Sequence, residues 1–260
     1  MKRKITGNVI RAQGTAFRIL DLYGFRHPSQ IDVCALATDR GVSVRSGGLS
    51  GCEARLIRVG SKGIMRVRDP ELGSARARFN VSHELGHWEL HADTQAFLCT
   101  SDKLRDYKTD PQESEANAFA SELLMPTYLV RPIIESHEPS LATTRGIASE
   151  FNVSVTAAAI RIFLETRHEC FLVLSRHGQV CWWMSGSERY GIWLESKQPL
   201  QPRSLAYHID EGIPLEPETV PSESWFLHLP SPENVEVTED SMQLGQTGFV
   251  LSFLTLGDAD

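Results

Sequence analysis

The 260-residue sequence predicts an α+β protein, because helical and extended patterns occupy separate stretches of the chain. Apolar residues recur at helical spacing near the N-terminus and again on both sides of residue 100. Short runs rich in β-branched residues, bounded by glycine-rich turns, lie between these helical stretches. After residue 168 the composition changes to that of strands and loops.

The first half of the chain predicts a small sheet placed among amphipathic helices. Gly24 and Gly41 end the first two helices, Ser74 caps a third, and Pro126 stops a fourth. The expected elements are helices at 8–23 and 28–41, strands at 42–44, 54–59 and 64–67, a helix at 74–91, a loop to about residue 111, and a helix at 113–125.

The second half begins with a helix–turn–helix pattern between residues 139 and 165, with its turn at Asn152-Val153. A turn at Arg176-His177-Gly178 then joins two strands into a hairpin. The remaining expectations are strands at 171–174 and 180–183, a proline-rich, loop-rich stretch at 198–222, and strands at 225–229 and 249–256.

These patterns predict three parts: a first domain over 1–137, a helix–turn–helix-like bridge over 138–167, and a C-terminal domain over 168–260. The last part is strongly acidic, with 14 Asp and Glu against 4 Lys and Arg in a chain of net charge −7. An acidic domain argues against broad binding to nucleic acid or to anionic membranes by that part.

Composition restricts the cellular setting. No apolar run reaches 18 residues, so no membrane span is expected. The basic start, Met1–Lys4, is not followed by a continuous apolar run, so no signal peptide is expected. Five scattered cysteines without CxxC spacing fit a reducing compartment, and we expect a cytoplasmic protein.

The segment His83-Glu84-Leu85-Gly86-His87 predicts a metal site. Residues four apart on a helix differ by about 40° around its axis, so His83 and His87 project from one face. Two imidazoles placed in this way can bind one Zn²⁺. Glu84 lies beside them, where it can accept a proton from water that the metal has acidified.

A zinc site for catalysis needs a third protein ligand and an open position. Asp93 has metzincin-like spacing, but a leucine stands where the chain would need glycine to bend back, and His91 lies too far along the helix axis. The apolar stripe of helix 113–125, extended backwards, reaches Glu113 and Asn117 and not Glu115. Glu113 is therefore the expected third ligand, and Asn117 is expected to orient a metal-binding histidine. The alternative for Glu113 is a solvated acid that stabilises the helix dipole.

The stretches Arg78–His91 and Glu113–Pro126 together resemble the ImmA/IrrE family of metallopeptidases, and the resemblance covers about residues 30–165. It implies a zincin-like, thermolysin-type zinc site with Glu113, the first Glu of a Glu-x-x-Ala-Asn motif, as third ligand. It also implies cleavage of a cognate helix–turn–helix repressor, which relieves repression of stress-response or mobile-element genes. Some members carry a sensory GAF domain in the C-terminal third, so a mixed α/β, GAF-like fold is expected there.

Two other functions compete with this hypothesis. In one, the protein docks on a repressor without cleaving it and zinc is structural; Cys99 would then be the natural fourth ligand. In the other, the helix–turn–helix reads DNA directly. The second helix of that pattern begins Val155-Thr156-Ala157-Ala158, without side chains that reach base edges, so direct DNA binding is not expected.

Overall fold

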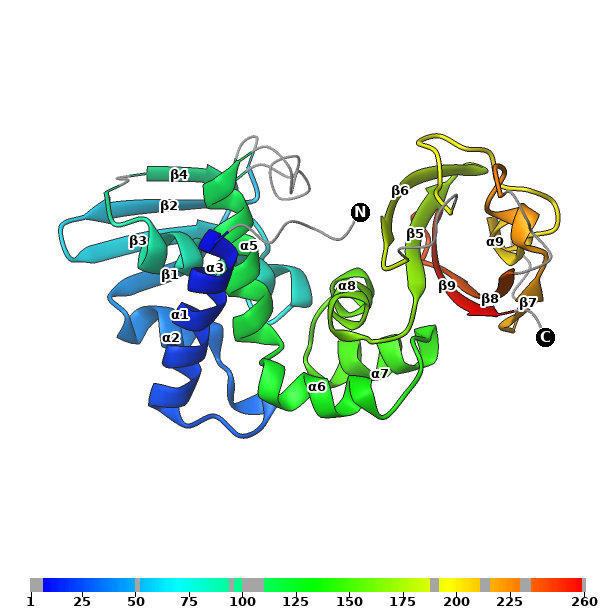
Figure 1. Ribbon diagram of the computed structural model, residues 1–260. Helices are drawn as coiled ribbons and strands as arrows, with labels where there is room; N and C mark the ends of the chain where they lie inside the picture. The colour runs from blue at the N-terminus through cyan, green and yellow to red at the C-terminus, as the bar shows by residue number, and fades with distance from the viewer. Residues whose placement is uncertain are drawn as a thin grey trace. The chain divides into compact units, whose positions relative to one another are not determined.

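The computed structural model describes residues 7–49, 52–93, 96–99, 110–187, 192–210, 216–229 and 235–258. Over these ranges the chain is α+β, which confirms the predicted class, and its strands form one sheet of four and one of five (Figure 1). The described residues fall into two compact units. The N-terminal unit comprises 7–131 and 147–154, and the C-terminal unit comprises 132–146 and 155–258. The three-part division predicted from the sequence stays a proposal.

The N-terminal unit begins with helices that the sequence predicts well, apart from one break. Gly24, with φ +66°, ends the first helix as expected. The single helix expected at 28–41 is wrong, because Asp32 caps a new helix by accepting hydrogen bonds from the N–H groups of Cys34 and Ala35. The elements are α1 (Gly7–Tyr23), the 3-10 helix η1 (Pro28–Gln30) and α2 (Val33–Asp39).

The four-stranded sheet has the order β1-β3-β2-β4, with β1 parallel to β3 and the other pairs antiparallel. Its strands are β1 (Val42–Ser46), β2 (Ala54–Val59), β3 (Lys62–Val67) and β4 (Ala96–Cys99). Leu56 and Met65 are buried on the face that α3 (Ala75–Leu90) covers, whereas Ile57 and Ile64 are exposed on the other face. The loop expected between residue 91 and Pro111 is corrected: β4 is an edge strand that pairs with β2.

Helix α3 is held against the sheet at its C-terminal end. The indole N–H of Trp88 donates to the carbonyl of Arg40 at 3.0 Å, and the guanidinium of Arg58 lies 3.7 Å from the centre of the Trp88 ring. Ser74 caps the other end, where its hydroxyl accepts the N–H of Ala77 at 3.1 Å. These contacts set the position of the helix that carries the HExxH segment.

Helices α3 and α5 (Pro111–Leu124) pack closely because α3 has a glycine at their contact. A Cβ built at Gly86 would lie 3.1 Å from the Cα of Ala116 and 3.2 Å from the Cβ of Phe119. The first is a backbone atom, so a side chain at this position would force the two helices apart.

We therefore expect Gly86→Ala to destabilise the protein by about 1–2 kcal/mol. Overpacking costs about 1–3 kcal/mol, and the better helix propensity of alanine returns only about 0.5–1 kcal/mol. Gly14→Ala in α1 is the matched control, because a Cβ there has its nearest contact at 3.9 Å, from the end of the Arg18 side chain. That variant should be slightly stabilised. Urea denaturation of both proteins tests this, and an increase in stability for Gly86→Ala would contradict it.

The helix–turn–helix predicted between 139 and 165 is present as two helices, α7 (Leu141–Glu150) and α8 (Val155–Glu165). Asn152 adopts φ +49° in the turn between them, a conformation that asparagine tolerates well. Helix α6 (Thr127–Glu135), which the sequence analysis did not predict, precedes them. Within the described ranges no single helix has the length and apolar character of a membrane span, although α7 and α8 pass that test when taken together as a bent pair.

The C-terminal unit is built on an antiparallel sheet of order β6-β5-β9-β8-β7. The expected hairpin turn is confirmed, with positive φ at His177 (52°) and Gly178 (70°), as a tight two-residue turn requires. The elements are β5 (Cys170–Arg176), β6 (Gln179–Ser185), α9 (Leu205–Asp210), β7 (Glu218–Val220), the 3-10 helix η2 (Ser222–Ser224), β8 (Val235–Gln243) and β9 (Phe249–Asp258).

Two expectations for this unit are corrected. The stretch expected to be loop-rich contains α9 and β7, and the strand expected at 225–229 is absent there. Trp225 instead follows η2 and is fully buried, with its indole N–H donating to the carboxylate of Glu239 at 2.7 Å. Burial raises the pKa of Glu239, although hydrogen bonds from Trp225, Ser241 and the start of α9 oppose the shift. The GAF-like character of the unit stays a prediction.

Candidate metal centre

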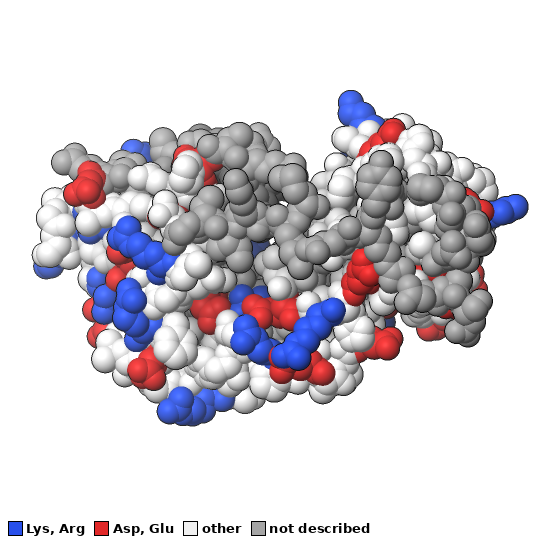
Figure 2. Space-filling view, in the orientation of Figure 1, with Lys and Arg blue, Asp and Glu red and all other residues white. Residues whose placement is uncertain are grey.

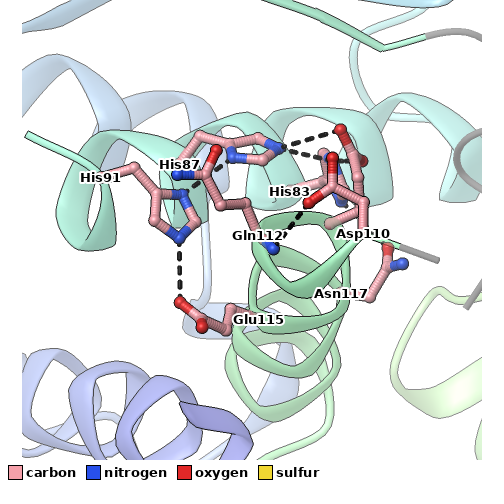
Figure 3. Close-up of polar contacts among 8 residues, drawn as sticks. His83, His87, His91, Asp110, Gln112, Glu115 and Asn117 are labelled. Atoms are coloured by element: carbon pink, nitrogen blue, oxygen red, sulfur yellow. Dashed lines mark hydrogen bonds and ion pairs between the residues drawn. The ribbon is translucent and has the colours of Figure 1, made fainter. Parts of the chain in front are cut away.

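His83 and His87 lie one turn apart on α3 and face each other, as the HExxH spacing predicts (Figure 3). Their ring centroids are 4.8 Å apart, and the two Nε2 atoms approach to 3.1 Å. Both side chains are fully buried. Two ring nitrogens are thus directed at one point inside the N-terminal unit.

Helix α5 contributes a carboxylate to the same point. The carboxylate of Asp110 caps this helix by accepting the N–H of Gln112, Pro111 occupies its first turn, and Glu113 follows one residue after Gln112. The Oε2 atom of Glu113 lies 3.2 Å from Nε2 of His83, and its Oε1 atom lies 3.8 Å from Nε2 of His87. Glu113 is buried, so the alternative of a solvated helix-end acid does not hold.

The three side chains fit a shared cation. Their ligand atoms all lie within 4.8 Å of one another. For bonds of about 2.0–2.1 Å the ligand atoms of a tetrahedral zinc site are separated by about 3.3 Å, and the separations here are 3.1, 3.2 and 3.8 Å. A buried carboxylate beside two imidazoles can therefore hold a metal ion, which would offset the cost of burying its charge.

The protonation states of His87 and Glu113 are those that a metal site requires. Burial lowers the pKa of His87 to about 4, which keeps this ring neutral near pH 7. Burial alone would raise the pKa of Glu113, but its contacts with His83 and His87 outweigh that effect, and the pKa lies well below its usual range. A neutral imidazole and an ionised carboxylate are the forms that bind metals.

A second layer of polar groups lies behind the two histidines. The Nδ1 atom of His83 is 2.9 Å from Oδ1 of Asn117, the contact expected for a residue that orients the ring. The Nδ1 atom of His87 is 3.0 Å from Nδ1 of His91, and Nε2 of His91 is 2.9 Å from Oε2 of Glu115 (Figure 3).

The positions of His91 and Glu115 beside His87 were not predicted from the sequence. They entered only as alternative third ligands, and the structure keeps both outside the group of three ligand atoms. The available signal was spacing: His91 follows His87 by four residues, and Glu115 is two residues from Glu113. Asp93, the other alternative, is exposed.

Glu84, the expected general base, is fully buried on α3 next to His83. The backbone of Cys99, the alternative fourth ligand, belongs to β4, and its side chain lies outside the described residues.

Part of the chain is similar to a known protein family. The Peptidase_M78 family, described as the IrrE N-terminal-like domain, matches residues 55–163. A solved structure, that of a Mycobacterium tuberculosis transcriptional regulator, has a similar fold, with a TM-score of 0.62 and 16% sequence identity over 94% of this chain and 75% of that chain. No curated protein matches the sequence. Residues 55–163 are therefore similar to the IrrE N-terminal-like domain, which fits the ImmA/IrrE family that the two motifs of this chain resemble.

Proposed function

We propose that this protein is a zinc-dependent endopeptidase that cleaves a helix–turn–helix transcriptional repressor and so relieves repression of stress-response or mobile-element genes. The observation that carries the proposal is the buried group of His83, His87 and Glu113, with Glu84 on the same helix as the two histidines. The match to a peptidase family supports it.

The ligand set favours zinc. Two imidazole nitrogens and one carboxylate oxygen are the donors of thermolysin-type sites, which leave one position open. A zinc ion held there would act as a Lewis acid toward water and a peptide carbonyl. His83, His87 and Glu113 would bind the ion, and burial of all three excludes bulk water from their side of it.

Glu84 is the proposed general base. It lies one residue from His83 and is enclosed by the protein, so it can take a proton from the attacking water and pass it to the amide nitrogen that leaves. This role needs a carboxylate that does not itself bind the metal, and Glu84 is absent from the group of ligand atoms.

The edge strand β4 suggests how a substrate is held. Among the described strands it is the last in the order β1-β3-β2-β4, and it pairs with β2 on one side. An extended peptide can add to a sheet edge through main-chain hydrogen bonds, which select little for sequence. We propose that docking of the folded substrate elsewhere on the chain supplies the remaining selectivity, with the helix–turn–helix-like segment and the C-terminal unit as the surfaces for it.

The α7–α8 segment is better suited to contacts with protein than to reading DNA. Arg161, the first basic residue of α8, is 1% exposed and lies 3.5 Å from Glu165. Its side chain is therefore turned away from any groove that α8 might enter. Figure 2 shows acidic and basic side chains interspersed over the described part of the face in view, without the one-sided basic surface of a DNA-binding protein.

The proposal is tested by incubating the zinc-loaded protein with purified helix–turn–helix repressors encoded near its gene and following cleavage by mass spectrometry. We expect one intact repressor to be cut, and a short peptide spanning the same bond to have a kcat/KM lower on the order of 10²-fold, because it lacks the docking contacts. Cleavage should stop when a chelator removes zinc. Equal kcat/KM for peptide and repressor would contradict docking, and zinc binding without cleavage of any repressor would favour a non-catalytic docking protein.

A further inference from the structure

We propose that His91 and Glu115 are positioning residues for His87, forming a hydrogen-bonded relay that fixes the tautomer and the orientation of this metal-binding ring. The inference rests on the metal site of the proposed function and is independent of which protein is cleaved. Neither residue belongs to the group of ligand atoms, so they act through His87.

The relay consists of two short contacts between buried side chains. The Nδ1 atoms of His87 and His91 are 3.0 Å apart, and Nε2 of His91 is 2.9 Å from Oε2 of Glu115. His87, His91 and Glu115 are exposed by 0, 9 and 6%. Contacts of this length between buried polar groups are hydrogen bonds, and each must have one donor and one acceptor.

Only one arrangement of protons satisfies the relay when His87 binds a metal through Nε2. That nitrogen must then keep its lone pair, so the proton of the neutral ring is on Nδ1 and is donated to His91. Nδ1 of His91 accepts it, and the proton of the His91 ring is consequently on Nε2, which donates to the carboxylate of Glu115. The carboxylate thus sets the direction of both hydrogen bonds.

The two metal-binding histidines are therefore supported differently. His83 donates to the amide oxygen of Asn117 at 2.9 Å, a single neutral acceptor on α5. His87 is supported by a ring that is itself anchored to a carboxylate, and this remote negative charge increases the electron density on the ligating nitrogen. Disrupting the relay should weaken His87 as a ligand and leave the His83 contact intact.

The relay also joins the two helices that supply the ligands. His91 is the C-cap of α3, and Glu115 lies on α5 two residues from Glu113. The contact between them fixes the end of α3 relative to the N-terminal part of α5. His87 and Glu113 are thereby held at the separation that a shared ion needs before the ion arrives.

A purely structural ion pair between His91 and Glu115 is the alternative, and it makes a different prediction. Such a pair would stabilise the metal-free and the metal-bound protein equally, so its loss would lower the melting temperature of the metal-free protein without changing metal affinity. A relay acts on His87, so its loss must reduce affinity for the metal itself.

The test uses the full chain and compares Zn²⁺ affinity, by competition with a chromophoric chelator at fixed pH, with the melting temperature of the metal-free protein. His91→Leu should weaken Zn²⁺ binding by about 10- to 100-fold. His91→Gln should recover most of this loss, because an amide oxygen can accept from His87 while its N–H₂ group donates to Glu115. Substituted Co²⁺ should show an altered absorption spectrum in His91→Leu and a near-native one in His91→Gln.

Glu115→Gln has a matched control in Glu122→Gln, since Glu122 is also buried on α5 but accepts hydrogen bonds from Thr127. We expect Glu115→Gln to lose Zn²⁺ affinity and Glu122→Gln to keep it. The relay is refuted if both variants bind Zn²⁺ like the native protein, or if they lose affinity equally. If His91→Leu does not fold, the comparison of Glu115→Gln with Glu122→Gln is sufficient to test the relay. A native protein that binds Zn²⁺ but cleaves no repressor would overturn the proposed function and leave the relay standing.

Discussion

Glu84→Gln is expected to lower the rate of repressor cleavage by about 10²–10⁴-fold, the usual contribution of a general base, while zinc remains bound. Glutamine has the size and shape of glutamate, so the fully buried site should accept it without repacking. The amide cannot take a proton from water at neutral pH. Single-turnover cleavage assays combined with metal analysis of the same samples measure both halves of this expectation.

The matched control is Glu89→Gln, which makes the same chemical change on the same helix. Glu89 forms a two-contact ion pair with Arg40, at 2.8 and 2.9 Å, and takes no part in the metal group. Its loss should cost some stability and leave the cleavage rate unchanged. If Glu84→Gln cleaves at the native rate, Glu84 is not the base, and another group must accept the proton.

The parts of the site that follow a local rule could be predicted from the sequence. His83 and His87 lie together because residues four apart share a helix face, and Asn117 lies behind His83 because it follows Glu113 by four residues on α5. Each inference needs only the geometry of one helix. The pairing of the two helices was inferred by excluding the other candidate third ligands, and the resemblance of the motifs to a known family implied the same pairing.

The contact between His91 and Glu115 could not be predicted in the same way, because it depends on how α3 and α5 cross. His91 has left the helical conformation, with φ −124° and ψ 61°, so the regular geometry of a helix no longer places its side chain. The close approach of the helices depends in turn on Gly86. The sequence shows that this position has no side chain, but it does not show which residues pack against it.

The edge strand β4 and the buried position of Trp225 could not be predicted from the sequence for a similar reason. Strand β4 has four residues and is defined by its pairing with β2, a contact between segments about forty residues apart in the chain. The segment that begins at Trp225 is predicted as a strand, but Trp225 is a buried anchor whose indole N–H donates to the Glu239 carboxylate. The structure of both segments therefore depends on contacts with residues that are distant in the sequence.

Glu113→Ala is expected to weaken zinc binding by about 10²–10⁴-fold, because structural zinc sites bind with about 10–16 kcal/mol in total and three protein ligands share it here. The loss has a second component. Without Glu113 the ion would have two neutral imidazoles and no anionic ligand, so its charge in the buried site would go uncompensated. Glu115→Ala removes an acid on the same helix that reaches His91 instead of the ligand group, and its effect should be at least tenfold smaller.

Stabilisation by zinc separates a ligand from a merely structural acid. The contacts of Glu113 with His83 and His87 outweigh the cost of burying its charge, so Glu113→Ala should cost the metal-free protein some stability as well. Zinc should raise the melting temperature of the native protein, because an ion that binds only the folded state at one hundred times its Kd contributes about 2.7 kcal/mol. In Glu113→Ala this increase should vanish at the same zinc concentration. A variant that keeps the full increase, or equal loss of zinc from Glu113→Ala and Glu115→Ala, would show that Glu113 is not a ligand.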